Sequence, residues 1–172
     1  AMTAHGLAQL ETFYERIWPD LRKLEYMRHE ELEHFHIENV QGAPENRIKV
    51  YVKVDYLARM PDGTVLLSDW KTGEQREPGR DDLQLAVYLL WATKRLGVPA
   101  EGLRAEYVYL REGARVPVST DPGNLNAAVE FIKAESLEIL GTRVFPAAPE
   151  EWRCRACNYA TLCPEGKEVL GI

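Results

Sequence analysis

Two segments in the first half of the chain are expected to pair as a β-hairpin, and this hairpin restricts the possible folds more than any other feature. Apolar side chains at every second position of Ile48–Val54 alternate with the side chains of Lys49–Asp55, which is the period of a half-buried strand. The sequence Pro61-Asp62-Gly63 favours a turn, and Thr64–Lys71 is expected to return as the second strand. One face of this hairpin must therefore cover a core.

Helices and strands are expected on both sides of the hairpin. Helices are predicted from apolar periodicity and from capping residues, and strands from alternation and turn residues. Helices are expected at 6–25, with a kink at Pro19, from Asp81 or Asp82 to about 96, and at 121–140. Strands are expected at 32–40, 103–110 and 115–119, and a loop at 41–46. This order predicts an α/β (α+β) fold in which helices flank a mixed sheet.

The length and the composition fit one globular domain. The chain has 172 residues, of which 45% are hydrophobic and 28% charged, as is ordinary for a soluble protein with a substantial core. No apolar run approaches the ~20 residues that span a bilayer. The first residues lack the basic and apolar regions of a signal peptide, and Ala1 before Met2 is typical of a tag remnant. We therefore expect a cytoplasmic protein that does not contact membranes.

Acidic and basic side chains are expected to meet at one end of the hairpin. Asp69 and Lys71 are two residues apart and project from the same strand face, and Asp55 lies across the turn from them. Two neighbouring carboxylates repel unless a cation lies between them, and hard oxygen ligands suit Mg²⁺ or Mn²⁺. The Trp70 carbonyl would be a further ligand. Lys71 would orient or help to deprotonate a water, or stabilise charge on a phosphate.

A solvated strand face is the ordinary interpretation of an Asp and a Lys two residues apart. Three features favour a site instead. The pair follows the apolar run Val65-Leu66-Leu67, Thr72-Gly73 ends the strand directly after it, and Asp55 also ends an apolar run. These features place the polar side chains at a sheet edge that a substrate can reach.

The residues from Asp55 onward resemble the core of the PD-(D/E)xK nuclease superfamily. The matching segments are Val54-Asp55, Leu67-Ser68-Asp69-Trp70-Lys71-Thr72-Gly73 and, on the next helix, Gln84-Leu85-Ala86-Val87-Tyr88. They look most like the RecB-like branch, which includes CRISPR-associated and AddB-type iron–sulfur nucleases. Each motif alone is weak, whereas their order and spacing together are specific. The resemblance implies a restriction-endonuclease-like fold, with a nuclease core at 1–148 and a cysteine-rich C-terminal tail of the same domain at 149–172.

The resemblance also implies roles for five residues. Asp55 and Asp69 would bind the metal, Lys71 would position or activate the attacking water, and Gln84 would support this site. Tyr88 would contact DNA or the catalytic lysine. An amphipathic helix with ordinary boundary residues is the alternative interpretation of the last two.

Helical geometry places Gln84 and Tyr88 on one face, since they are one turn apart. Trp91 and Arg95 are expected to extend that face. The core-facing residues of this helix are expected to be Leu83, Val87 and Leu90.

A histidine near the start of the chain matches a further feature of the RecB-like branch. In that branch a histidine precedes apolar and aromatic residues on the first helix, and His5 precedes such a run here. The resemblance would make His5 a third metal ligand. A plain surface histidine is an open alternative, and His29, His34 and His36 are competing candidates.

All three cysteines lie within ten residues of the tail, at Cys154, Cys157 and Cys163. In a cytosolic chain this spacing indicates metal or iron–sulfur ligation rather than disulfides. In the RecB-like branch such a triplet joins an upstream cysteine to hold a structural [4Fe–4S] cluster. This sequence has no fourth cysteine. Three explanations remain open, namely a cysteine in a segment upstream of this sequence, a histidine or exogenous ligand, and zinc held by three thiolates.

The net charge of −6 argues against a protein that holds nucleic acid by bulk electrostatics alone, but a metal site requires carboxylates. A basic surface and scattered solvated charges are both open interpretations of the cationic residues Arg76, Arg80, Lys94, Arg95, Arg153 and Arg155.

Three functions are compatible with these features. The first is a divalent-metal-dependent deoxyribonuclease, a RecB-like exonuclease acting on single strands or duplex ends in repair, recombination or CRISPR-type processing, with a helicase or other subunits as partners. The second is a non-hydrolytic DNA-binding module of a repair or helicase–nuclease complex. The third, a zinc-ribbon-like interaction domain, explains only the cysteines.

Overall fold

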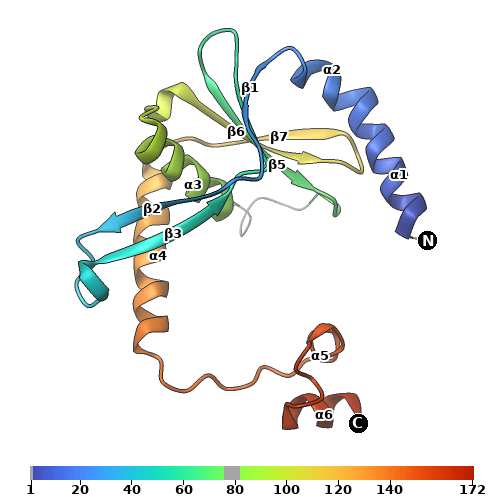
Figure 1. The fold of residues 1–172 in the computed structure, drawn as a ribbon, viewed down its shortest axis with the longest axis vertical. Helices are drawn as coiled ribbons and strands as arrows, with labels where there is room; N and C mark the ends of the chain where they lie inside the picture. Colours follow the sequence, from blue (N-terminus) through green and yellow to red (C-terminus); the bar gives the residue numbers. More distant parts are fainter. Residues whose placement is uncertain (1, 76–81) are drawn as a thin grey trace. The chain divides into compact units, whose positions relative to one another are not determined.

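The computed structural model describes residues 2–75 and 82–172 (Figure 1). The chain forms two compact units, Ala1–Leu137 and Glu138–Ile172, with the division inside the last long helix. The predicted division after residue 148 stays a prediction. No helix in the described ranges is long and apolar enough to cross a membrane.

A five-stranded sheet forms the centre of the first unit. Its strand order is β1-β4-β5-β6-β7, and only the pair β5–β6 is parallel. The strands are β1 (Glu25–Arg28), β4 (Tyr56–Arg59), β5 (Val65–Lys71), β6 (Leu103–Tyr109) and β7 (Ala114–Val118). The helical connection between β5 and β6 allows their parallel pairing. The mixed sheet flanked by helices confirms the predicted fold class.

The predicted pairing of residues 48–55 with residues 64–71 is wrong. Strand β3 (Arg47–Lys53) pairs with β2 (Leu32–Glu38) in a separate two-stranded sheet, and the short helix η2 (Pro44–Asn46) lies between them. The antiparallel neighbour of β5 is β4. Because Tyr56, Leu57 and Ala58 are all buried, β4 shows no alternation that would reveal it as a strand.

One face of the five-stranded sheet is covered by the N-terminal helices. These are α1 (Met2–Thr12), the π-helical turn η1 (Phe13–Ile17) and α2 (Trp18–Leu21), and they lie on one side of the sheet in Figure 1. The buried side chains of Ile17 and Leu21 pack with Leu66 and Val108. The predicted helix up to residue 25 is wrong at its end, because Glu25 begins β1 at the sheet edge.

The other face packs against α3 (Asp82–Trp91), its π-helical continuation η3 (Ala92–Leu96) and α4 (Pro122–Gly141). The short helix η4 (Ala100–Gly102) leads into β6. Leu85 and Leu89 join Val65 and Leu67 in the main core. Trp91, which was expected to extend the face of Gln84 and Tyr88, is only 2% exposed. Strand β3 also contacts α3, so this helix is covered on more than one side.

The second unit contains α5 (Glu151–Ala156) and α6 (Pro164–Leu170), which contact one another. Gly166 lies close to the intervening turn. A Cβ at this position would lie 3.1 Å from the carbonyl oxygen of Ala160 and 3.3 Å from its Cα. The short helices of the tail are therefore packed together, with Cys154 and Ala160 buried among them.

Candidate active site

Strand β5 directs Asp69 and Lys71 toward α3. Residues two apart on a strand share a face, and Val65 and Leu67 place that face in the main core. Asp69 is only 2% exposed, and its Oδ2 lies 2.7 Å from Nζ of half-buried Lys71. A buried carboxylate needs a counter-charge, and Lys71 provides it.

Asp55 lies in the bend between β3 and β4. The N–H of Trp70 donates a 2.8 Å hydrogen bond to Oδ2 of Asp55, which brings this carboxylate to the main chain between Asp69 and Lys71. Burial raises the pKa of the Asp55 carboxyl above its ordinary value, although the Trp70 hydrogen bond opposes this shift. The structure therefore brings together the three residues that the sequence singled out.

A chain of hydrogen bonds extends from Lys71 into α3. Lys71 Nζ donates to Oε1 of Gln84 at 2.8 Å, and Nε2 of Gln84 donates to the Tyr88 hydroxyl at 2.9 Å. That hydroxyl donates to the Lys53 carbonyl at 2.9 Å. Burial raises the pKa of Tyr88, and the carboxylates of Asp69 and Asp55 add to the shift. Tyr88 therefore remains a protonated donor and reaches Lys71 through Gln84.

A tyrosine that the sequence analysis missed supports Lys71. Tyr107 lies opposite Asp69 on the parallel strand β6, and Lys71 Nζ is 5.0 Å from the centre of its ring. A cation over an aromatic face is held by the ring quadrupole. The pairing of β5 with β6 joins residues far apart in sequence, so no local motif indicates this contact.

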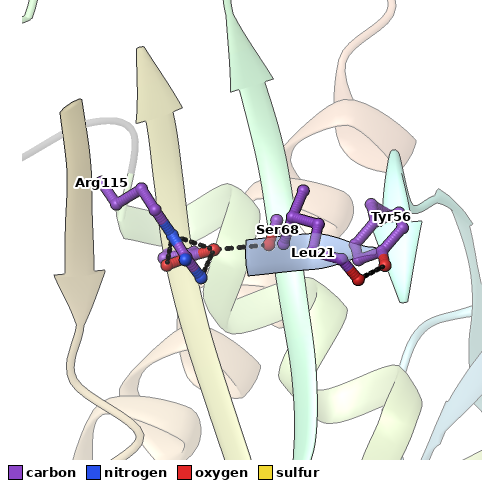
Figure 2. Close-up of polar contacts among 5 residues, drawn as sticks. Leu21, Tyr56, Ser68 and Arg115 are labelled. Atoms are coloured by element: carbon purple, nitrogen blue, oxygen red, sulfur yellow. Dashed lines mark hydrogen bonds and ion pairs between the residues drawn. The ribbon is translucent and has the colours of Figure 1, made fainter. Parts of the chain in front are cut away.

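A second missed group lies on the opposite sheet face, which is the face covered by the N-terminal helices. Ser68 Oγ donates to Oε1 of Glu106 at 2.7 Å, and Arg115 pairs with the same carboxylate, with its Nη2 at 2.8 Å (Figure 2). Ser68 directly precedes Asp69, so this network joins β5, β6 and β7 behind the acidic residues. The signal in the sequence is an acidic residue, Glu106, between Ala105 and the run Tyr107-Val108-Tyr109.

Helix α1 approaches the end of β5. Nε2 of Gln9 donates to the Thr72 carbonyl at 2.8 Å, and exposed His5 lies one turn earlier on the same helix. The role of His5 as a metal ligand stays a prediction. Arg76 and Arg80, proposed for a basic surface, and Asp81, a proposed helix cap, lie outside the described residues.

The donor set has the chemistry of a site for a hard divalent cation. Two carboxylates and a backbone carbonyl are the oxygen ligands that Mg²⁺ and Mn²⁺ prefer. The described residues contain no group of three or more His, Cys, Asp or Glu side chains arranged to hold a metal ion. Asp55 and Asp69 are the two acidic oxygen donors that the described residues bring to this site.

The cysteines of the second unit differ in exposure. Cys154 is buried, Cys157 is exposed and Cys163 is half-buried. Backbone N–H groups of Tyr159 and Gly166 approach Sγ of Cys157 and Cys163, each at 3.4 Å. In the part of the chain that the structure describes, the three thiols do not converge on one ligand position.

Comparisons with known proteins place the chain in a family. One similar solved structure is described as "Crystal structure of SSO0001" and shares 16% sequence identity with this chain. The match covers 93% of this chain and 70% of the solved chain, with a TM-score of 0.48. No curated protein matches the sequence. A family model described as PD-(D/E)XK nuclease superfamily matches residues 2–164, which is most of the chain. The chain therefore belongs to the PD-(D/E)XK nuclease superfamily.

Proposed function

We propose that this chain is a divalent-metal-dependent deoxyribonuclease of the RecB-like branch, which acts as an exonuclease on single strands or duplex ends. The observation that carries this proposal is the contact of Lys71 with both Asp69 and Gln84, beside the carboxylate of Asp55. Action in repair, recombination or CRISPR-type processing, with a helicase or other subunits as partners, belongs to the same proposal.

Each residue of the site has a distinct part in this reaction. Asp55, Asp69 and the Trp70 carbonyl would hold Mg²⁺ or Mn²⁺, which supplies Lewis acidity and an activated water when bound. Lys71 orients the attacking water and stabilises negative charge on the phosphate. Gln84 holds the Lys71 ammonium, and Tyr88 holds Gln84 by accepting from its amide.

The test is cleavage of single- and double-stranded DNA with Mg²⁺ or Mn²⁺. Asp69→Ala and Lys71→Ala are each expected to lower the cleavage rate by at least about 100-fold, the scale of losing an electrostatic catalytic group. Lys23→Ala is the matched control, because its exposed ammonium pairs with Asp20 of α2 and not with a residue of the site. Cleavage by Asp69→Ala and Lys71→Ala at the parental rate would show that the site is wrongly assigned.

A second candidate function is a non-hydrolytic DNA-binding module of a repair or helicase–nuclease complex. It is favoured by one observation, namely that the described residues hold no group of three or more metal-binding side chains. Binding of DNA without cleavage in Mg²⁺, Mn²⁺ and Co²⁺ would favour this function. Metal-dependent cleavage that Lys71→Ala abolishes would exclude it.

We also propose that Cys154, Cys157 and Cys163 hold a [4Fe–4S] cluster with a fourth ligand, with zinc as the alternative. Their confinement to ten residues and the N–H groups directed at two of the sulfurs support this proposal. The thiols must move together for this, since they do not converge in the described structure. Iron, sulfide and zinc analysis of anaerobically purified protein separates the two metals, and protein free of all three would contradict the proposal.

A further inference from the structure

A groove of about 370 Å³ lies where β2 meets η3, away from the three acidic and basic residues of the proposed site. Its lining consists of two histidines, a phenylalanine, one acidic residue and two cations, at His34, Phe35, His36, Glu38, Lys94 and Arg95. The nuclease reaction proposed above uses none of these side chains. The groove therefore needs an explanation of its own.

Cations outnumber the one lining carboxylate, Glu38, around this groove, although the chain is acidic overall. Lys94 and Arg95 are exposed, and Lys49 lies opposite His36 on the neighbouring strand. None of these three cations forms an ion pair with a carboxylate of the described residues. The pKa of His34 is lowered, first by burial and then by Lys49, His36 and Arg95. Cations that lack internal partners gather here, which suits an anionic ligand.

Aromatic side chains lie among these cations. The strand register places His34 beside Tyr51 and His36 beside Lys49, so all four share the solvent-facing side of the β2–β3 hairpin. Tyr51 is 58% exposed, its ring centre lies 6.0 Å from that of His34, and Lys49 Nζ is 4.7 Å from it. An exposed tyrosine ring beside cations that lack a carboxylate partner is the kind of surface on which a nucleic-acid base stacks next to its phosphates.

Two elements run from the groove to the proposed active site. Helix α3 and η3 run from Gln84, which contacts Lys71, to Arg95, a span of about 16 Å at the rise of a helix. Strand β3 runs from Lys49 to Lys53, whose carbonyl accepts the Tyr88 hydrogen bond. Figure 1 shows α3 and the β2–β3 hairpin on the same side of the five-stranded sheet. A strand held at one site is thus within a few nucleotides of the other.

We propose that this groove binds the phosphodiester backbone of single-stranded DNA beyond the scissile bond, with Lys94, Arg95 and Lys49 at the phosphates and Tyr51 as a stacking surface. This inference rests on the proposed nuclease function for the identity of the ligand. The groove acts as a holding site, so it contributes to binding of long strands and leaves the chemical step at Asp69 and Lys71 unchanged.

The test compares Lys94→Glu/Arg95→Glu with the matched control Arg22→Glu/Lys23→Glu, an adjacent Arg–Lys pair that is exposed directly after α2. Both variants change the net charge equally. Binding of labelled oligothymidylates of about 20 and about 4 nucleotides is measured by fluorescence anisotropy in EDTA, over a range of NaCl concentrations. Thermal unfolding of each variant checks the fold, and Tyr51→Ala is a second variant that changes no charge.

Lys94→Glu/Arg95→Glu is expected to weaken binding of the long strand at least about tenfold. The slope of log K against log[NaCl] is expected to become about 1.4 less steep, for two lost phosphate contacts. Tyr51→Ala is expected to weaken it about tenfold without changing the salt dependence. Binding of the short strand, and binding by the control variant, are expected to change by less than about twofold, because neither depends on these contacts.

Equal binding of the long strand by Lys94→Glu/Arg95→Glu and the parent would overturn the inference, even if the parent cleaves DNA. Competition by a polyglutamate peptide as strong as by the oligonucleotide would also overturn it, because the groove would then bind any polyanion. Another outcome is that the parent cleaves no DNA while Lys94→Glu/Arg95→Glu still binds the long strand more weakly. That result would support the groove as a binding site and contradict the proposed nuclease function.

Discussion

Lys71 Nζ donates a 2.8 Å hydrogen bond to Oε1 of Gln84, and this contact joins the last residue of β5 to the first turn of α3. The two residues are thirteen positions apart. Because the Gln84 carbonyl accepts from the lysine, its amide is directed to the Tyr88 hydroxyl at 2.9 Å. The orientation of one amide therefore fixes the position of the ammonium.

Gln84→Ala is expected to lower the cleavage rate about 10- to 100-fold, because an unsupported Lys71 leaves its position beside Asp69. The loss should appear in kcat rather than KM, since Gln84 acts through the lysine. Single-turnover cleavage measurements check this, with Gln41→Ala as the control on an exposed loop. A change confined to KM would contradict a positioning role.

Asp55→Asn is expected to stabilise the metal-free protein at pH 7 by less than about 1 kcal/mol while abolishing cleavage. Burial raises the folded-state pKa of Asp55, so the ionised carboxylate costs stability above that pKa, and the cost disappears below the ordinary value of 3.8. The difference in unfolding free energy between variant and parent should therefore shrink as the pH falls.

Addition of Mg²⁺ should reverse this order, because binding to the folded state stabilises the parent and not Asp55→Asn. Thermal unfolding with and without Mg²⁺ measures the effect. Equal stabilisation of both proteins by Mg²⁺ would show that Asp55 is not a ligand.

Glu106→Ala is expected to destabilise the protein by about 3–5 kcal/mol, because it leaves the Arg115 guanidinium and the Ser68 hydroxyl without their shared partner. The double variant Glu106→Leu/Arg115→Met removes both charges and is expected to recover most of that loss. Urea unfolding measures both. A double variant no more stable than Glu106→Ala would show that packing, rather than the unpaired charge, causes the loss.

Tyr88→Phe is expected to cost about 1–3 kcal/mol of stability, because the Lys53 carbonyl and the Gln84 amide both lose a partner at a buried hydroxyl. The control Tyr14→Phe removes a hydroxyl from a side chain that is 62% exposed, so its stability should be unchanged. Denaturant unfolding compares the two variants. Similar small effects in both would mean that the Tyr88 hydrogen bonds contribute little.

Local patterns in the sequence determined the elements that carry the site. A period of two placed Asp69 and Lys71 on one face of a strand, and a period of about 3.6 placed Gln84 and Tyr88 on one face of a helix. Such patterns depend on near neighbours along the chain, so the sequence alone sufficed for them. The order of these motifs was also enough to indicate the superfamily that the family model shows.

Tertiary structure decided which elements pair and which polar groups meet. The partner of β5 is the buried strand β4 and not β3. The sequence did not reveal this, because a strand buried on both faces carries no alternation. The Tyr107 ring near Lys71, and Glu106 between Ser68 and Arg115, follow from that sheet order. These contacts form because residues far apart in the sequence are buried together. The local pattern of residues along the chain does not show which of them will meet.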